Sequence, residues 1–324
     1  MSTFSFIYPG QGSQTPGMGQ YLYNEFAIAR TTFEEASDAL SIDMKKLCFT
    51  GSEQDLALTE NTQPALLTTS VATSRVLEKH LGISAKATAG HSIGEYSSFV
   101  LGGVLSFGDA VKAVRLRGQY MQSAVPVGLG GMFATLGLDE AQVQFLCQWA
   151  EKQSGFKPLN PANYNCDGQI VVSGNLKTLN WLKEHFNSSI FVENGFAEPK
   201  RAKLIPLQVS APFHCEMMKP AEENMRVFLN TVKFEDSRID IFQNFHAKAE
   251  RKADVLKENL IKQISGSVKW TQSIQEMSKS GHKKFIECGN GTVLKGLLKK
   301  INPELEVFST NNLDDIKLIE AAQK

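Results

Sequence analysis

Residues 90–94 read Gly-His-Ser-Ile-Gly, the G-x-S-x-G pattern in which a serine lies on a sharp turn between a strand and a helix. The two glycines allow the backbone to turn tightly, so the hydroxyl of Ser92 projects at the head of the following helix. The backbone N–H of Ile93 then points to where an oxyanion would form, and the helix N-terminus favours negative charge there. The pattern predicts a nucleophilic serine; a chance glycine–serine turn is the alternative when the pentapeptide stands alone.

A serine nucleophile needs a base, and the chain has six histidines. His214 follows the predicted strand Ala202–Val209, and active sites collect at the carboxyl ends of parallel strands. His91 adjoins Ser92, but neighbouring side chains on a tight turn point apart, so we expect His91 to line the pocket. From the residues alone, His214 is either the general base or a structural histidine.

Two further loops are rich in glycine, at residues 9–14 (Pro-Gly-Gln-Gly-Ser-Gln) and 289–291 (Gly-Asn-Gly). Thr15 stands where the Rossmann pattern needs its third glycine, and neither loop continues into the Gly-Lys-Ser/Thr of a phosphate-binding loop. The first loop follows an apolar strand, so its backbone amides can approach a ligand closely.

The segments around these motifs predict a parallel α/β sheet, because strands and helices alternate. The expected elements are strand Phe4–Tyr8, a helix around Tyr21–Leu40, a helix from Gln63 with Pro64 in its first position, strand Lys86–Ala89 and a helix from Glu95. Glu95 and Asp109 are expected to be surface or capping carboxylates.

The middle of the chain predicts a smaller unit with the ferredoxin-like order β-α-β-β-α-β. Its expected elements are strand Gly131–Leu138, helix Asp139–Gln153, strands Ala162–Asn165 and Gln169–Ser173, helix Leu176–Phe186 and strand Ala202–Val209. The expected fold is therefore α/β, with a hydrolase-like parallel-sheet large subdomain (residues 1–127 and 206–324) and an inserted ferredoxin-like small subdomain (residues 128–205).

Composition excludes several classes of protein. The 324 residues are 42% hydrophobic and carry 34 basic and 34 acidic side chains, so a general nucleic-acid binder, which would be basic, is not expected. Five scattered cysteines without a CxxC pair predict neither a disulfide framework nor a metal site, and favour the cytoplasm. The N-terminus shows no signal peptide, and the apolar stretch 99–107 is too short to span a membrane.

Four motifs together resemble the malonyl-CoA:acyl-carrier-protein transacylase family, the discrete acyltransferases of fatty acid or polyketide synthesis. The similarity covers essentially the whole chain and lies in residues 9–14, Gly90–Tyr96, Arg115–Gly118 and Ser210–His214. The tail shares Val268–Thr271 and residues 289–291, although Asn290 stands where the family usually has proline.

The resemblance implies a role for each matching residue. Ser92 corresponds to the nucleophile that takes the malonyl group as an ester, and His214 to its general base. In this family a backbone carbonyl orients the histidine, and that carbonyl corresponds to Gln263. The backbone N–H groups of Gln11 and Ile93 correspond to the oxyanion hole.

The resemblance also implies the selectivity for malonyl. Arg117 matches a buried arginine that binds the free malonyl carboxylate; without the resemblance it would be read as a solvated helix arginine. Phe213 resembles a bulky residue associated with malonyl over methylmalonyl, and His91 is expected to line the same pocket. The implied enzyme is an S-malonyltransferase that needs no cofactor, since the coenzyme A thioester is a substrate.

Two other functions stay open at this point. A trans-acting acyltransferase of a polyketide synthase would share the same motifs, and a serine hydrolase acting on acyl thioesters would share the elbow. The expected partners are malonyl-CoA and an acyl carrier protein, with no nucleic acid, no membrane and a monomeric enzyme.

The distribution of charge agrees with anionic partners. Residues 251–300 carry 11 basic and 4 acidic side chains, and several of the lysines lie near the loop at 289–291. This excess predicts either a solvated helix face or a docking surface for an acidic protein, with Lys295 and Lys299 as its contact residues.

Overall fold

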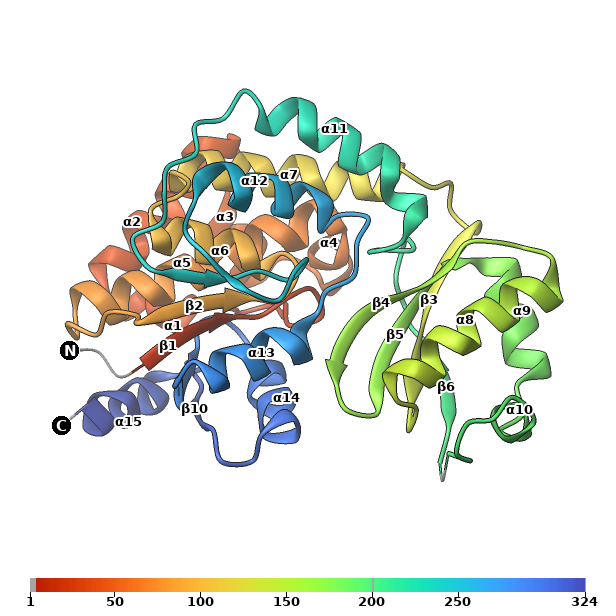
Figure 1. The fold of residues 1–324 in the computed structure, drawn as a ribbon. Coiled ribbons are helices and arrows are strands. Elements are labelled where there is room, and N and C mark those ends of the chain that lie inside the picture. Colours follow the sequence, from red (N-terminus) through yellow and green to blue (C-terminus); the bar gives the residue numbers. More distant parts are fainter. Residues whose placement is uncertain (1–3, 200, 324) are drawn as a thin grey trace.

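Two separate sheets organise the protein (Figure 1), which we analysed as a computed structural model describing residues 4–199 and 201–323. Within these residues the larger sheet has six strands in the order β10-β9-β1-β2-β7-β8. All neighbours in it are parallel except β7 and β8, which run antiparallel. The strands are β1 (Phe4–Tyr8), β2 (Ala87–Gly90), β7 (Asp240–Phe242), β8 (Ala249–Glu250), β9 (Lys284–Glu287) and β10 (Glu306–Phe308).

Helices of the large unit cover this sheet on both faces (Figure 1). They are α1 (Gln20–Glu25), α2 (Ala27–Leu40), α3 (Met44–Thr50), α4 (Glu53–Ala57), α5 (Thr59–Lys79), α6 (Gly94–Gly102), α7 (Phe107–Ser123), the 3₁₀ turn η1 (Glu216–Met218), α11 (Lys219–Leu229), α12 (Ala253–Lys262), α13 (Trp270–Lys279), α14 (Val293–Ile301) and α15 (Leu313–Gln323).

The smaller sheet has four antiparallel strands in the order β4-β5-β3-β6, the order of a ferredoxin-like unit. Its elements are β3 (Gly130–Leu136), α8 (Glu140–Ser154), β4 (Leu159–Cys166), β5 (Gln169–Asn175), α9 (Leu176–His185), α10 (Ser189–Glu193) and β6 (Lys203–Pro206). The predicted fold class is therefore confirmed. The division of the chain at residues 127/128 and 205/206 remains a proposal.

Strand β1 shows why the large sheet needs helices on both faces. Its Phe6 and Tyr8 pack in a cluster with Leu77 of α5, whereas Ile7 packs on the opposite face with Leu298 of α14. Every residue of β1 is buried, as expected for a strand in the centre of a parallel sheet.

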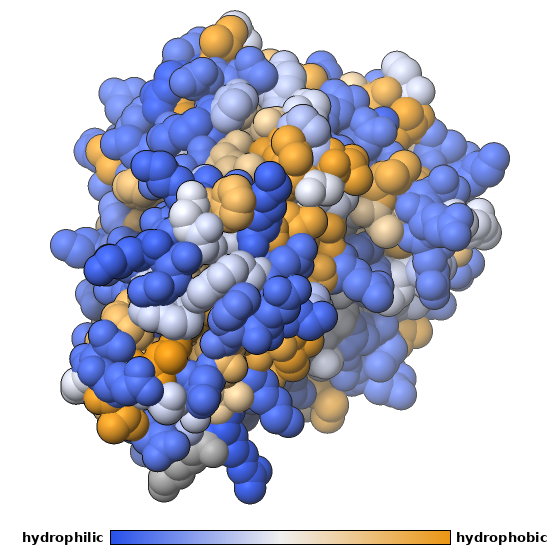
Figure 2. Space-filling view, turned by 90° about the vertical axis from the view of Figure 1, so that its right-hand side faces the viewer, coloured by the Kyte–Doolittle hydropathy of each residue, from blue (hydrophilic) through white to orange (hydrophobic). Residues whose placement is uncertain are grey.

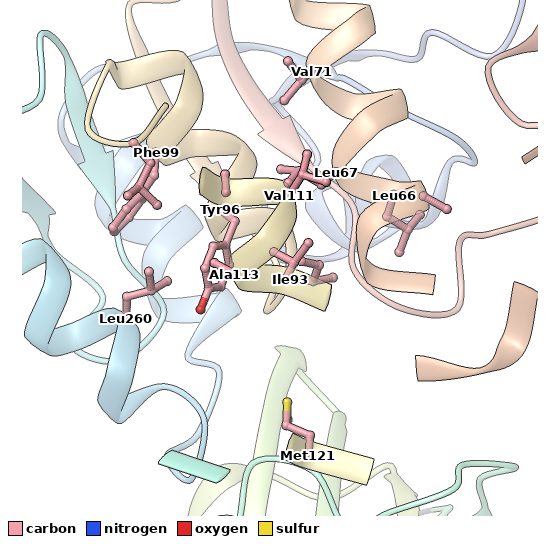
Figure 3. Close-up of a cluster of buried hydrophobic side chains, with 14 of the residues drawn as sticks. Leu66, Leu67, Val71, Ile93, Tyr96, Phe99, Val111, Ala113, Met121 and Leu260 are labelled. Atoms are coloured by element: carbon pink, nitrogen blue, oxygen red, sulfur yellow. The ribbon is translucent and has the colours of Figure 1, made fainter. Parts of the chain in front are cut away.

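The core beside the sheet supports the predicted serine turn (Figure 3). Ile93, Tyr96 and Phe99 pack in one cluster with residues of α5, α7 and α12. Their exposed fractions are 1%, 0% and 0%, so the start of α6 is fixed by apolar burial.

Two helix boundaries differ from the predictions. The helix expected around Tyr21–Leu40 is interrupted at Phe26, whose extended backbone separates α1 from α2. Helix α5 begins at Thr59, so Pro64 lies inside the helix instead of in its first position. Proline leaves the carbonyl four residues earlier without its helical partner, and here Arg115 Nη1 donates to that Glu60 carbonyl at 2.8 Å.

The small sheet is tied to the large unit along β4. The Tyr164 N–H donates to the Val268 carbonyl at 2.9 Å, and the Val268 N–H donates to the Ala162 carbonyl at 2.8 Å. Thr271 Oγ1 adds a bond to the Tyr164 carbonyl at 3.0 Å. These bonds fix one wall of the space between the two sheets.

Candidate active site

The serine turn joins the end of β2 to the start of α6, as its motif predicts. A Cβ atom on Gly90 would lie 2.0 Å from the carbonyl carbon of Gly94, and one on Gly94 would lie 2.3 Å from the Tyr8 carbonyl oxygen. Both positions therefore require glycine. Ser92 itself has a φ of 50°, a left-handed conformation that costs a residue with a side chain about 1–3 kcal/mol.

His214 lies within hydrogen-bond distance of Ser92, although the two residues are 122 positions apart in the sequence. Its Nε2 lies 2.7 Å from Ser92 Oγ, and its Nδ1 lies 2.8 Å from the carbonyl oxygen of Gln263. Because a carbonyl can only accept, Nδ1 carries the proton and Nε2 is left to accept the serine proton. His214 has a φ of 60°, so both members of the pair have left-handed backbones.

Burial, and next the positive charge of Arg117, lower the pKa of His214 to about 3. The bond to the Gln263 carbonyl opposes this effect. The neutral form of histidine is the base, and a lowered pKa keeps that form populated as the pH falls. His214 is therefore ready to take a proton throughout the neutral and mildly acidic range.

We expect the reactivity of Ser92 to be almost independent of pH between 5 and 7.5. The measurement is the rate constant for modification by a phosphonofluoridate, over the range in which circular dichroism shows an unchanged fold. The two ends should agree within about twofold, whereas a histidine with the ordinary pKa of about 6.5 would lose about 30-fold. A decline of the second size would contradict a depressed pKa.

The predicted oxyanion donors are the backbone N–H groups of Gln11 and Ile93. Gln11 and Ile93 both line the cavity that contains Ser92. Within residues 4–199 and 201–323, neither backbone N–H has a hydrogen-bond partner. Asn290 fastens the loop that carries Gln11, because its Nδ2 donates to the Ser13 carbonyl at 2.6 Å. These two free amides, one of them on the loop that Asn290 binds, can donate to a developing negative charge.

Arg117 is 1% exposed and points at the serine from α7. Its Nη2 donates to Ser92 Oγ at 3.1 Å and to Gln263 Oε1 at 3.0 Å, and its Nη1 donates to Gln63 Oε1 at 2.9 Å. All three acceptors are neutral. A buried guanidinium without a directly bound carboxylate is a strong binding group for an anionic ligand.

These side chains surround one cavity of about 270 Å³ between the two sheets. Its lining includes seven of the eight predicted site residues: Gln11, His91, Ser92, Ile93, Arg117, Phe213 and His214. Gln263, the eighth, contacts His214 from behind. His91 does not reach the serine hydroxyl; its Nε2 instead lies 2.9 Å from Asn165 Oδ1.

The rim of the cavity is partly apolar. Leu207 and Val293 line the cavity and are 36% and 52% exposed. Figure 2 shows the molecule from the side of the small sheet, where apolar side chains gather between hydrophilic areas. The entrance can therefore accept a ligand with an uncharged arm.

Three residues of the site were not predicted from the sequence. Gln63 binds the Arg117 guanidinium, and Asn244 Oδ1 accepts from the Ser92 N–H at 2.7 Å. The expectation that Glu95 is a surface or capping carboxylate is wrong, since Glu95 is 0% exposed and accepts from Gln243, Asn244 and Gln263. Asp109, in contrast, lies in the first turn of α7 beside its N-cap Ser106, as expected.

Across residues 4–199 and 201–323, no three His, Cys, Asp or Glu side chains are grouped as a metal ion would require. In the same residues no helix combines the length and apolar character needed to cross a membrane.

The chain matches the family model of the acyl transferase domain over residues 5–301. It is 42% identical over 320 residues to the malonyl CoA-acyl carrier protein transacylase of Bacillus subtilis, covering 98% of this chain and 96% of the relative. Over 317 residues it is 41% identical to the enzyme of that name from Staphylococcus aureus, covering 98% of each chain.

Solved structures agree with these relatives. The malonyl CoA-acyl carrier protein transacylase of Clostridium perfringens superposes with a TM-score of 0.90 at 36% identity, covering 99% of this chain and 97% of that one. A malonyl-transacylase solved in complex with a type II polyketide synthase acyl-carrier protein gives 0.90 at 35% identity, covering 99% and 100%.

Proposed function

The chain belongs to the malonyl-CoA:acyl-carrier-protein transacylases, and we propose that it transfers malonyl through an ester on Ser92 to the phosphopantetheine thiol of a carrier protein. The observation that carries this proposal is the joint placement of Ser92, His214 and Arg117 at one cavity. A nucleophile, its base and a binding group for a carboxylate are what malonyl transfer requires.

The first step acylates the enzyme. Ser92 Oγ attacks the thioester carbonyl of malonyl-CoA while its proton passes to His214 Nε2. The N–H groups of Gln11 and Ile93 donate to the oxyanion of the tetrahedral intermediate. The carbon–sulfur bond then breaks, and coenzyme A leaves as a thiol with the proton from His214.

The second step reverses these roles. The carrier's phosphopantetheine thiol gives its proton to His214 Nε2 and attacks the carbonyl of the Ser92 ester. Collapse of the intermediate breaks the ester bond, and His214 returns the proton to Ser92 Oγ. The product is malonyl-carrier protein and the enzyme is restored, so the kinetics are ping-pong.

The experiment for this proposal separates the two steps. Enzyme loaded with radiolabelled malonyl is freed of malonyl-CoA and then mixed with carrier protein bearing phosphopantetheine. We expect the label to move to the carrier faster than it appears as free malonate. Release of free malonate at the same rate with and without carrier would favour the serine hydrolase.

Arg117 provides the expected selectivity for malonyl, because a guanidinium binds a carboxylate through two parallel hydrogen bonds. An acetyl group offers no such partner. The Arg117→Ala variant should therefore lose malonyl transfer and gain relative acetyl transfer.

The ratio of kcat/KM for malonyl-CoA to that for acetyl-CoA should fall by about 10²–10³-fold, the size of a lost buried charge pair. Arg117→Lys is the control; it keeps the charge without the planar fork, so its ratio should lie between those of the other two proteins. An unchanged ratio in Arg117→Ala would show that Arg117 does not bind the malonyl carboxylate. Phe213, which is 8% exposed in the same cavity, remains our candidate for excluding methylmalonyl.

The pathway follows from the carrier that the enzyme serves. We propose fatty acid synthesis, with a polyketide synthase as the second candidate because one superposed relative was solved with a polyketide carrier protein. Comparing kcat/KM for the two carriers of one organism distinguishes these assignments.

The basic segment 251–300 remains our candidate docking surface, although the structure changes the choice of lysines. Lys299 Nζ donates to the carbonyls of Pro303 and Leu305, so its charge supports its own turn. Exposed Lys300 reaches Gln169 Oε1 at 3.5 Å, at the cavity lining. Lys295 and Lys300 on α14, which packs against β4 (Figure 1), are therefore the better contact residues.

Reversal of both charges, Lys295→Glu with Lys300→Glu, should raise the KM for carrier protein several-fold at low salt. The effect should fade with added salt, and acylation by malonyl-CoA should change little, because rim charges act mainly on association. Lys112→Glu, at an exposed position on α7, is the matched control. If the double variant transfers malonyl to the carrier normally at low salt, Lys295 and Lys300 belong to a solvated helix face and do not bind the carrier.

We propose that the reaction takes place in the cytoplasm and without a cofactor. The site needs no cofactor, since malonyl-CoA is itself the substrate, and no nucleic acid or membrane takes part. We also propose that the active unit is a monomer. All five cysteines are free and buried, which supports the reducing cytoplasm as its location.

A further inference from the structure

Glu95 is a buried carboxylate that the proposed reaction does not use. It lies in the first turn of α6, three residues after Ser92, and is 0% exposed. Burial raises its pKa, and hydrogen bonds from its neighbours oppose that shift. No Lys, Arg or His of the described chain forms a salt bridge with it.

Three N–H groups donate to Glu95. Gln243 Nε2 lies 2.9 Å from Oε1, the Asn244 backbone N lies 2.9 Å from Oε2, and Gln263 Nε2 lies 3.0 Å from Oε2. A carboxylate can accept all three bonds, because it has no hydrogen of its own. A neutral amide at this position would turn its NH₂ group towards at least one of these donors.

Asn244 connects Glu95 to the nucleophile. Its Oδ1 accepts from the Ser92 N–H at 2.7 Å, and its Nδ2 donates to the Gly90 carbonyl at 2.7 Å. These two bonds bracket the turn in which Ser92 has its left-handed φ of 50°. Glu95 therefore fixes the backbone of Asn244, and the side chain of Asn244 stabilises the strained turn at Ser92.

Gln263 connects Glu95 to the base and to the arginine. Its Nε2 also donates to the Ser92 carbonyl at 3.0 Å, and its own carbonyl accepts from His214 Nδ1 at 2.8 Å. Its Oε1 accepts from Arg117 Nη2 at 3.0 Å. One amide therefore lies between the buried carboxylate and the buried guanidinium, and the same residue orients the histidine.

From these contacts we propose that Glu95 is a positioning residue for malonyl transfer: it fixes Asn244 and Gln263, and through them the Ser92–His214 pair. The proposal builds on the proposed function, because it assigns a role within that same site. The anionic form is the one that binds all three donors.

The test compares Glu95→Ala, Glu95→Gln and Glu222→Gln. Glu222 is the control, since it is 7% exposed and binds Lys219, Arg226 and Ser265, with no hydrogen bond to the three residues Ser92, His214 and Gln263. Each protein is first titrated with a phosphonofluoridate to count reactive serines. The rate constant for acylation by saturating malonyl-CoA is then expressed per reactive site, together with the KM.

We expect Glu95→Ala to lower this rate constant by about 10²-fold, the loss typical of reacting groups displaced by about 1 Å, with little change in KM. Glu95→Gln should recover part of the loss, because one amide oxygen can still accept from Asn244 and Gln263. Glu222→Gln should react at the normal rate. Phosphonofluoridate should modify Ser92 more slowly in both Glu95 variants.

A purely structural role would give another result: fewer reactive sites or a lower Tm, with a normal rate constant at each remaining site. That result would overturn the proposal. It would also be overturned if Glu95→Gln were as slow as Glu95→Ala at full site occupancy. Failure of the parent protein to accept malonyl at all would instead contradict the proposed function, while the phosphonofluoridate rates would still test Glu95.

Discussion

Removal of His214 should slow acylation of Ser92 by about 10²–10⁴-fold, the range that a positioned general base contributes. Without Nε2 at 2.7 Å, the serine proton would have to pass to water. The Arg117 guanidinium would remain 3.1 Å from Ser92 Oγ, so binding of malonyl-CoA should survive. The measurement is a rapid-quench time course with labelled malonyl-CoA.

The choice of replacement matters because the backbone at His214 has a φ of 60°. Alanine is strained in this conformation, whereas asparagine adopts it more readily. His214→Asn is therefore the main variant and His214→Ala the companion, with circular dichroism as the control for folding. Acylation within a few-fold of the parent rate in both variants would remove His214 from proton transfer.

The pattern of the sequence was sufficient to predict the turn that carries Ser92. Gly90 and Gly94 are needed because carbonyl groups approach within 2.0–2.3 Å of the positions where Cβ atoms would be, and only glycine fits. The small sheet was also predicted, because apolar runs and turn residues indicate the order β-α-β-β-α-β along the chain. Asp139, the first residue of the predicted helix Asp139–Gln153, is the N-cap of α8 and forms a capping box with Gln142.

Glu95 shows where reasoning along the sequence fails. A carboxylate in the first turn of a helix is usually a solvated cap, and local pattern offers no reason to expect otherwise. Its donors Gln243 and Gln263 lie 148 and 168 positions further along the chain. Only tertiary packing brings them together, so neither the burial of Glu95 nor its contacts could be read from spacing.

The predicted start of helix α5 at Pro64 was wrong for a related reason. The first helical position is favourable for proline because no N–H is needed there, and this local rule gave the wrong start for α5. In the structure the cost of an interior proline is offset by Arg115, which binds the freed carbonyl of Glu60 from another helix. The residues around Pro64 in the sequence do not indicate that Arg115 will bind this carbonyl.

The role of Arg117 could be predicted only from the family resemblance. Its neighbours in the sequence are ordinary helix residues, and most helix arginines are solvated. Its burial follows from Gln63 and Gln263, which lie 54 and 146 positions away and provide neutral acceptors. The resemblance supplied a role, and the structure shows a buried guanidinium that donates only to neutral acceptors and could therefore bind an anion.

Mass spectrometry of the intact protein after exposure to malonyl-CoA shows whether Ser92 carries the malonyl group. We expect one malonyl group per chain, located by peptide mapping on Ser92. The Ser92→Ala variant should carry none, because its side chain has no oxygen to form the ester. Ser92→Gly, which adopts the positive φ freely, should give the same result with an undistorted turn. Stoichiometric malonylation of either variant, or of another residue in the parent protein, would show that Ser92 is not the nucleophile.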